Sequence, residues 1–150
     1  MRLVIQRVTR ADLWADGVDC GSIGAGLVVF VGVATKDEVG DASKLAAKLI
    51  ALRVFEDSNG KMNRSIQDTG GELMVVSNFT LYASTTKGSR PSFDAAARPE
   101  QAKPLYEHFV ELLRLTGLRL VTGVFQASMR VVVDNDGPVT LICESICDSK

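Results

Sequence analysis

The sequence predicts an α+β domain, a mostly antiparallel β-barrel-like fold that carries two helices. Three observations support this class. Short runs rich in Val, Ile and Leu recur along the chain and are separated by turns containing Gly, Asn and Asp. Two longer segments instead show helical periodicity. The expected strands and helices do not alternate in the order typical of a parallel α/β fold.

The composition is that of one ordinary globular domain. Of the 150 residues, 46% are hydrophobic and 23% are charged. No repeat, linker or low-complexity segment divides the chain, so residues 1–150 are expected to form a single domain, with residues 145–150 as a tail. The longest apolar run, residues 27–33, is far too short to span a membrane. With no secretory signal visible, we expect no membrane partner and a cytoplasmic location.

The first strands are expected from β-branched and apolar runs. A strand is predicted over residues 1–9, and a short second strand over residues 12–15. A Gly-rich turn is expected at residues 21–26. Residues 27–33 are apolar at every position except one glycine, which is typical of a central strand buried on both faces.

A first helix is expected next. Thr35 and Glu38 have the spacing of a capping box, which marks a helix start. The inward face of this helix is predicted to contain Ala42, Leu45, Ala46, Leu49 and Ile50. Residues 56–71 are polar and are interpreted as a loop with a hairpin turn at Asn59–Gly60. A strand over residues 73–76 then leads directly into Ser77.

A second helix is expected from Pro99 to Gly117. Pro104 lies inside this stretch, so the regular helix could begin only there. Its inward face is predicted to contain Leu105, Phe109, Leu112 and Leu113.

The end of the chain is expected to be β structure. Strands are predicted near residues 118–126 and 129–133, followed by a turn at residues 134–138 and a last strand over residues 139–144.

Metal and cofactor chemistry are disfavoured. Cys20, Cys143 and Cys147 form an odd set without CxxC spacing and are expected to be reduced structural thiols. The single histidine, His108, falls in a predicted helix, so neither a zinc site nor a Ser-His-Asp triad is indicated. No Gly-rich loop has the spacing of a nucleotide-binding motif. No cofactor and no metal are expected.

The net charge of −1 argues against a broad basic face for nucleic acid. Any contact with RNA must therefore come from a local patch, and no DNA partner is expected.

Two segments could carry chemistry. Ser77-Asn78-Phe79-Thr80-Leu81 follows a strand, where hydroxyls and free amides could bind a carbonyl oxygen or orient a water. Spacing alone favours another interpretation, a strand end whose hydroxyls satisfy their own turn. The second segment, Asn135-Asp136-Gly137-Pro138-Val139-Thr140, is a hairpin turn on periodicity alone.

Together these segments resemble the paired SQFTL and NxGPVT signatures of the D-aminoacyl-tRNA deacylase family. Residues 4–8, 60–63, 70–71 and 87–93 are also similar to that family, in the same order. The resemblance extends from residue 1 to about residue 144. One position departs from it, because Asn78 stands where the family usually has Gln. The two side chains share the amide group and differ by one methylene.

The resemblance implies a homodimeric hydrolase that releases D-amino acids from tRNA. Gly137 and Pro138, joined by a cis peptide bond, would enter the partner subunit's pocket and offer two carbonyls to the substrate ammonium. Arg7 would brace this loop, and Met129 is also expected to bind substrate. An L side chain would collide with the Gly-Pro backbone, whereas D-aminoacyl-tRNA and glycyl-tRNA would be accepted.

The resemblance places catalysis on Ser77, Asn78, Phe79 and Thr80. The N–H groups of Phe79 and Thr80 are candidates to stabilise the oxyanion. Either the Thr80 hydroxyl attacks the ester, or the ribose 2′-OH orients a water, and the lack of a side-chain base favours the second route.

The charges after this motif offer a local RNA-binding patch. Lys87 and Arg90, with Arg98 and Lys103 nearby in sequence, are expected to meet tRNA phosphates. The alternatives are a non-catalytic RNA-binding β-barrel that holds an aminoacyl-tRNA end, and a structural dimerisation module.

Overall fold

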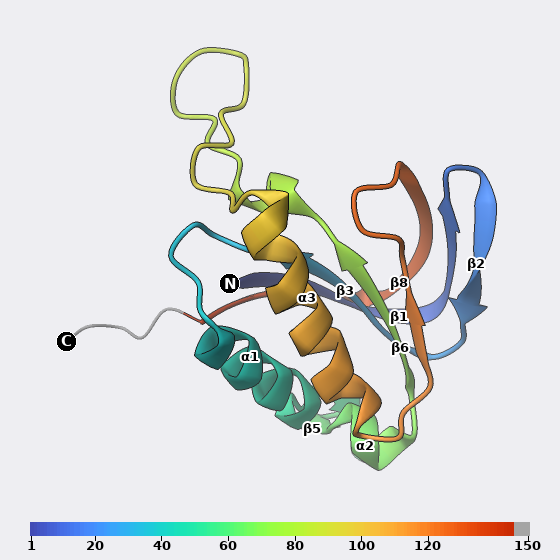
Figure 1. The fold of residues 1–150 in the computed structure, drawn as a ribbon. Helices are drawn as coiled ribbons and strands as arrows, with labels where there is room; N and C mark the ends of the chain where they lie inside the picture. Colours follow the sequence, from blue (N-terminus) through green and yellow to red (C-terminus); the bar gives the residue numbers. More distant parts are fainter. Residues whose placement is uncertain (146–150) are drawn as a thin grey trace.

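The computed structural model describes residues 1–145 as an α+β domain built on a curved six-stranded sheet (Figure 1). The sheet contains β1 (Arg2–Ala15), β2 (Val18–Ile23), β3 (Gly26–Gly32), β6 (Glu72–Ser77), β7 (Leu120–Thr122) and β8 (Met129–Glu144). The other elements are α1 (Val39–Ala51), the hairpin β4 (Phe55–Glu56) and β5 (Met62–Arg64), α2 (Ile66–Thr69), the 3-10 turn η1 (Phe79–Tyr82) and α3 (Pro99–Arg114). The predicted fold class is confirmed, with a short third helix, α2, in addition to the two expected.

Strand β1 organises the sheet because it pairs with three other strands. One edge of β1 pairs antiparallel with β3 along its first half and with β2 along its second half. The opposite edge pairs antiparallel with β8 over almost its whole length. The separate strand expected at residues 12–15 is therefore wrong, because these residues continue β1. The turn expected at residues 21–26 is also shorter, because β2 extends to Ile23.

The other half of the sheet is parallel. Strand β6 pairs parallel with β3 on one side and with β7 on the other. Each of these parallel neighbours is separated in sequence by a long connection, which contains α1 between β3 and β6 and α3 between β6 and β7. The carboxyl ends of β3 and β6 therefore lie at the same edge of the sheet. η1 follows β6 at this edge.

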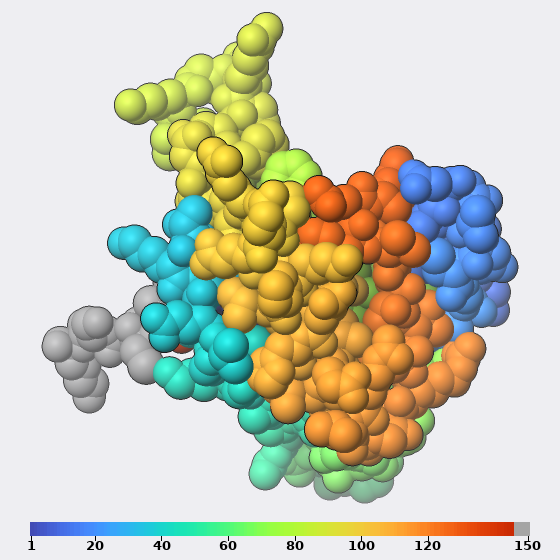
Figure 2. Space-filling view, viewed as in Figure 1, coloured from blue at the N-terminus to red at the C-terminus, as the bar shows by residue number. Residues whose placement is uncertain are grey.

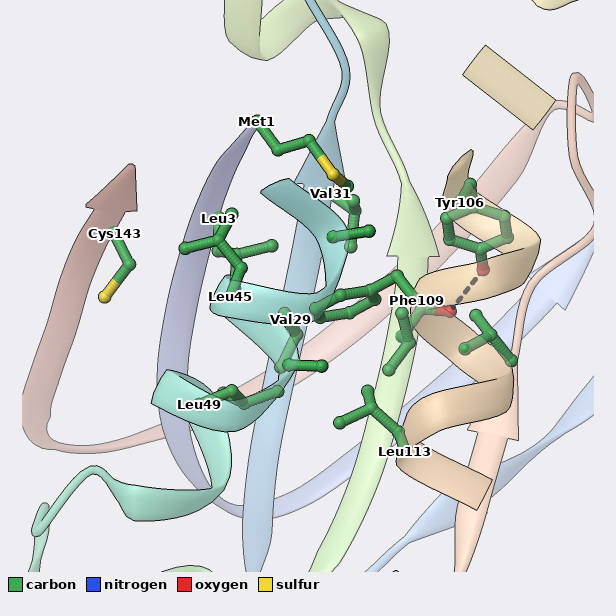
Figure 3. Packing of buried hydrophobic residues seen from close by; sticks show 14 of the residues in the cluster. Met1, Leu3, Val29, Val31, Leu45, Leu49, Tyr106, Phe109, Leu113 and Cys143 are labelled. Atoms are coloured by element: carbon green, nitrogen blue, oxygen red, sulfur yellow. Dashed lines mark hydrogen bonds between the residues drawn. The ribbon is translucent and has the colours of Figure 1, made fainter. Parts of the chain in front are cut away.

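Helices α1 and α3 lie side by side over one face of the sheet (Figure 1). Leu45 and Leu49 of α1 pack with Phe109 and Leu113 of α3 against strand side chains such as Val29 (Figure 3). Ile50 and Leu112, which were also expected to face inward, are half-buried at the margin of this core. A second apolar cluster, around Leu13, Val28 and Met74, fills the other side of the curved sheet.

The helix starts differ in detail from the prediction. The capping box of α1 joins Glu38 to Asp41, so the expected pair of Thr35 and Glu38 is wrong. The Asp41 carboxylate accepts the Glu38 N–H at 2.8 Å, and this hydrogen bond lowers the pKa of Asp41. Helix α3 begins at Pro99 as predicted and continues through Pro104 without interruption. Pro104 has no N–H to donate to the carbonyl of Glu100, and both residues are exposed, so water can bind this carbonyl.

Three connecting segments also differ from expectation. The stretch 56–71 is not a simple loop, because it contains β5 and α2 as well as the expected turn, which Gly60 closes on Asp57. The strand expected near residues 118–126 is reduced to β7. Residues 134–138 do not separate two strands. They lie within β8, where the pairing with β1 shifts register.

The end of the described chain is anchored. Ser145 was expected to begin a tail, but it is buried, and its N–H donates to the Met1 carbonyl at 3.0 Å. The rest of the expected tail, including Cys147, lies outside the described residues. Cys20 and Cys143 are free thiols, and burial raises the pKa of Cys143. Within residues 1–145, no helix is long and apolar enough to cross a membrane.

Candidate functional site

A cavity of about 610 Å³ opens at the edge where β3 and β6 end. Its walls come from the ends of β3 and β6, residues 93–99, the first two turns of α3, and residues 125–131. Most of the lining is apolar and includes Phe30, Val31, Val76, Phe79, Phe93, Phe125, Met129 and Val131. Polar groups are few, which is the usual composition of a pocket for an organic ligand.

The polar side of the cavity is the turn that follows β6. Ser77 and Asn78 line the cavity, and the Asn78 N–H donates to the Val31 carbonyl at 2.8 Å, which extends the β3–β6 ladder by one residue. The Asn78 side chain then caps η1, because its Oδ1 accepts the Thr80 N–H at 3.2 Å and the Thr80 Oγ1–H at 2.5 Å. Local capping chemistry therefore ends the strand and starts the turn.

This cap changes one expectation about the oxyanion donors. The Thr80 N–H was expected to be free to stabilise the oxyanion. It is instead hydrogen-bonded to the Asn78 side chain. The Phe79 N–H is the first amide of η1 and has no acceptor among residues 1–145. Phe79 is 58% exposed, and its ring meets the Phe93 ring edge to face, with 5.0 Å between the ring centroids.

Four of the predicted site residues lie together at the cavity: Ser77, Asn78, Phe79 and Met129. Thr80 follows them on η1 and is exposed, outside the cavity lining. The prediction missed Phe93 as a wall residue, although it ends a stretch that resembles the family. It also missed Tyr106, which the helical pattern indicates only as a core residue, and Gln126, for which the sequence carries no signal.

The cavity wall contains no side-chain base. Its described lining residues include no carboxylate, histidine or lysine. The Tyr106 hydroxyl donates to the Val75 carbonyl at 3.1 Å, and burial raises the pKa of Tyr106 to about 12. His108 lies away from the cavity, with Nε2 3.3 Å from the Ser43 hydroxyl between α3 and α1. Within residues 1–145, no three or more His, Cys, Asp or Glu side chains come together in a way that could hold a metal ion.

The Gly137–Pro138 segment forms a separate feature. The bond between these residues is cis, as the resemblance implied. Strand β8 pairs Asn135 with Val8 and Thr140 with Gln6, so residues 136–139 bulge out opposite Arg7. Gly137 and Pro138 are exposed and do not line the cavity of their own chain.

Arg7 and Asn135 hold this bulge in place. Arg7 is 7% exposed, its Nη1 donates to the Val54 carbonyl at 2.8 Å, and its Nε lies 3.1 Å from Asp136 Oδ2. The Nε–H does not point at the carboxylate, so this contact is an ion pair and not a hydrogen bond. In the amide orientation that satisfies both ends, Asn135 donates to the carbonyls of Arg7 and Val139 at 3.0 and 3.2 Å.

Residues 84–92, which include Lys87 and Arg90, form a loop that projects from the body of the domain (Figures 1 and 2). Two hydrogen bonds between Ser84 and Ser92, of 2.7 and 2.9 Å, close the base of this loop. Both basic side chains are exposed, and neither lines the cavity. The structure therefore places Lys87 and Arg90 next to the site in sequence but outside the cavity, whereas Arg98, which was also expected to meet phosphates, lines the cavity.

The fold and site define a small α+β domain whose barrel-like sheet carries an apolar cavity with a capped, polar turn at its edge. Comparison with known proteins identifies the group. The family model described as D-Tyr-tRNA(Tyr) deacylase matches residues 4–144, and the chain belongs to this family.

Curated relatives agree with this assignment over nearly the whole chain. A D-aminoacyl-tRNA deacylase of Koribacter versatilis (strain Ellin345) is 54% identical over 145 residues, which is 97% of each chain. A D-aminoacyl-tRNA deacylase of Bacillus velezensis is 50% identical and aligns over 97% of this chain and 99% of the relative.

Two solved structures share the fold. One, titled c-Myc DNA Unwinding Element Binding Protein, superposes with a TM-score of 0.91 at 40% identity and covers 98% of this chain and 100% of the other. The other, described as a probable eukaryotic D-amino acid tRNA deacylase, has a TM-score of 0.84 at 15% identity and covers 95% and 98%. At that identity the second likeness supports the fold alone.

Proposed function

We propose that the protein hydrolyses the ester bond of D-aminoacyl-tRNA and releases the free D-amino acid and tRNA. The observation that carries this proposal is the near-full-length similarity to relatives curated with that activity. The aligned span includes the whole cavity wall, both signature segments and the basic loop. The reaction belongs in the cytoplasm, where charged tRNA is made and used.

The cavity suits a reaction that relies on backbone groups. Its described lining contains no side-chain base that could activate Thr80 as a nucleophile. The proposed nucleophile is therefore a water that the neighbouring ribose 2′-OH orients. The water oxygen bonds to the ester carbonyl carbon, the bond to the ribose oxygen breaks, and a water proton ends on that oxygen. The Phe79 N–H, which has no acceptor among residues 1–145, stabilises the developing oxyanion.

The active unit of this proposal is a homodimer. Gly137 and Pro138 lie outside the cavity of their own chain, so they can act on a substrate only in the cavity of another copy. The exposed apolar side chains Phe79, Val132 and Ile142 offer surface that a second copy would bury. Arg7, Asp136 and Asn135 keep the donated loop in one shape.

Selection of handedness is proposed to follow from steric exclusion. With the substrate ammonium and ester carbonyl held, the backbone at Gly137–Pro138 would occupy the space that an L side chain needs. A D side chain points away from it. Glycyl-tRNA has no side chain to exclude, so it should also be hydrolysed.

Lys87 and Arg90 are proposed to contact tRNA phosphates. Their projecting loop lies next to the cavity in sequence, just before Phe93 of the wall, and the exposed Arg98 lines the cavity itself. A few such contacts give salt-sensitive, modest affinity, which suits an enzyme that must release correctly charged tRNA.

The direct test follows ester loss from D-tyrosyl-tRNA, L-tyrosyl-tRNA and glycyl-tRNA with purified protein. Hydrolysis of the D and glycyl substrates with the L substrate spared supports the proposal. Equal hydrolysis of D and L substrates would contradict the exclusion step, and a protein that hydrolyses none of them would contradict the enzymatic function.

A second candidate is nucleic-acid binding without turnover. It is favoured by one observation, the 40% identity to the structure titled c-Myc DNA Unwinding Element Binding Protein. The same preparation would then bind an aminoacyl-tRNA end or a DNA duplex and leave the ester intact. The net charge of −1 weighs against binding through a broad surface.

A further inference from the structure

The side-chain oxygen of Asn78 accepts both hydrogen-bond donors of one residue. Asn78 Oδ1 lies 3.2 Å from the Thr80 amide nitrogen and 2.5 Å from Thr80 Oγ1. The Thr80 hydroxyl proton is therefore directed at Asn78. An amide oxygen accepts a hydrogen bond but is too weak a base to remove that proton, so the hydroxyl stays neutral.

We infer that Asn78 is a positioning residue that makes Thr80 a hydrogen-bond acceptor in the reaction and leaves the Phe79 N–H as the oxyanion donor. This inference rests on the proposed function. With its proton held by Asn78, the Thr80 oxygen presents only lone pairs, and it accepts a hydrogen bond from the attacking water at the cavity edge, next to Phe79 of the wall. Thr80 does not form a bond to the ester carbon.

The length of the Asn78 side chain decides this arrangement. An Asn oxygen reaches an N–H two residues ahead, which is why Asn is among the strongly favoured helix caps and Gln is not. This chain has Asn at position 78, so its Thr80 is held by a short local cap. The cap also fixes the orientation of the Asn78 amide, because its oxygen and not its nitrogen is directed at Thr80.

A matched pair of variants isolates the capping oxygen. Asn78→Ser and Asn78→Ala both lose the amide nitrogen, but only Ser keeps an oxygen that can cap η1. A cap oxygen is worth on the order of 1 kcal/mol, equivalent to about tenfold in rate. We expect kcat on D-tyrosyl-tRNA to be about tenfold lower for Asn78→Ala than for Asn78→Ser, with similar KM. Equal kcat values would overturn the inference.

A second background tests whether Asn78 acts through the Thr80 hydroxyl. Thr80→Val keeps the side-chain shape and removes the oxygen. In this background, we expect the difference in kcat between Asn78→Ser and Asn78→Ala to shrink to about twofold, because the hydroxyl through which Asn78 is inferred to act is gone, while the backbone N–H of residue 80 can still be capped. An undiminished tenfold difference would mean that Asn78 acts by another route, and the inference would fail.

A measurement without substrate separates this inference from the proposed function. The amide proton of Thr80 can be followed by NMR in the wild type and in both variants. It should exchange with solvent slowly in the wild type and in Asn78→Ser, and at least about tenfold faster in Asn78→Ala. Unchanged exchange would refute the cap even if the protein is an active deacylase. Protected exchange without any hydrolysis would refute the proposed function and leave the cap intact.

Discussion

Arg7 and Asp136 face each other across the point where β8 leaves its ladder with β1, with 3.1 Å between Arg7 Nε and Asp136 Oδ2. Arg7 is buried, whereas the Asp136 side chain is 46% exposed. The buried guanidinium of Arg7 also donates a hydrogen bond to the Val54 carbonyl. Arg7 therefore links the exposed Gly137–Pro138 bulge to the connection after α1. The shape of the Gly137–Pro138 bulge therefore depends on a residue in the first strand.

Replacing Arg7 tests this dependence. Arg7→Lys keeps the charge but cannot contact Val54 and Asp136 in the same fork geometry. We expect kcat/KM on D-tyrosyl-tRNA to fall by about tenfold or more, and the free energy of unfolding to fall by about 2 kcal/mol. Arg10→Lys is the matched control, because Arg10 pairs with Asp12 on the surface of the same strand. It should change stability by less than about 0.5 kcal/mol. Equal effects of the two substitutions would contradict the bracing role.

Gly137 is expected to tolerate no side chain. Its φ is +116°, and an added Cβ would lie 2.9 Å from the Val139 backbone nitrogen and 3.1 Å from Arg7 Nη2. Gly137→Ala should therefore destabilise the fold by about 2 kcal/mol and displace the bulge, with loss of deacylase activity. Gly17→Ala provides the comparison, because Gly17 also has a positive φ, +79°, but nothing within 4 Å. Thermal unfolding of both variants separates backbone strain, about 1 kcal/mol, from the clash.

Gln126 occupies a backbone conformation that favours glycine. Its φ is +66°, and it is the third residue of a turn closed by the Ala127 N–H on the Val124 carbonyl at 3.1 Å. We expect Gln126→Gly to raise the free energy of unfolding by about 1 kcal/mol, and Gln126→Ala to give no such gain. Denaturant titration measures both. Because Gln126 lines the cavity, a fall in kcat/KM for both variants would indicate that its amide contacts the substrate.

Tyr106 should make stability fall at alkaline pH. Burial raises its pKa from 10.0 to about 12, so the folded state binds the phenolic proton more tightly than the unfolded state. This contribution is fully present below pH 10 and is lost as the pH rises toward 12, by about 2–3 kcal/mol. The difference in unfolding free energy between wild type and Tyr106→Phe should therefore shrink from pH 9 to pH 12. A constant difference would show that the hydroxyl is not held as described.

The basic loop should act on tRNA affinity and not on the chemical step. Replacing Lys87 and Arg90 with Gln should raise KM for D-tyrosyl-tRNA and leave kcat unchanged. The salt dependence of binding should fall by about one unit for each phosphate that the loop no longer neutralises. Lys48 and Arg114 are exposed near the far ends of α1 and α3, so the same double change there is the control. A control that raises KM equally would show that only total charge matters.

Local patterns in the sequence predicted the elements that depend on local chemistry. The periodic residues of α1 and α3 form the core between helices and sheet, because burial of one helical face is encoded every three or four positions. The strand before Ser77 was also predictable. Its exit was not, because the N-cap of η1 by Asn78 depends on a hydrogen bond that no periodicity reports.

Sheet pairing and the second half of the site required the structure. Residues 12–15 and 134–138 contain turn-forming or polar residues, but long-range pairing between β1 and β8 keeps both within continuous strands. Phe93, Tyr106 and Gln126 reach one cavity from three distant segments. Their convergence is a property of the parallel β3–β6 edge and the start of α3, which a single sequence does not reveal.

Strand β8 contains both cavity-lining residues and the Gly137–Pro138 bulge. Met129 and Val131 help to enclose the cavity of their own chain, and the bulge at Gly137–Pro138 follows a few residues later. If two copies pair as proposed, strand β8 of each molecule lines its own cavity through Met129 and Val131. The same strand places Gly137 and Pro138 in the cavity of the other molecule. A displacement of β8 by a ligand or a substitution would then be transmitted from one pocket to the other, and the pair would respond as a mechanical unit.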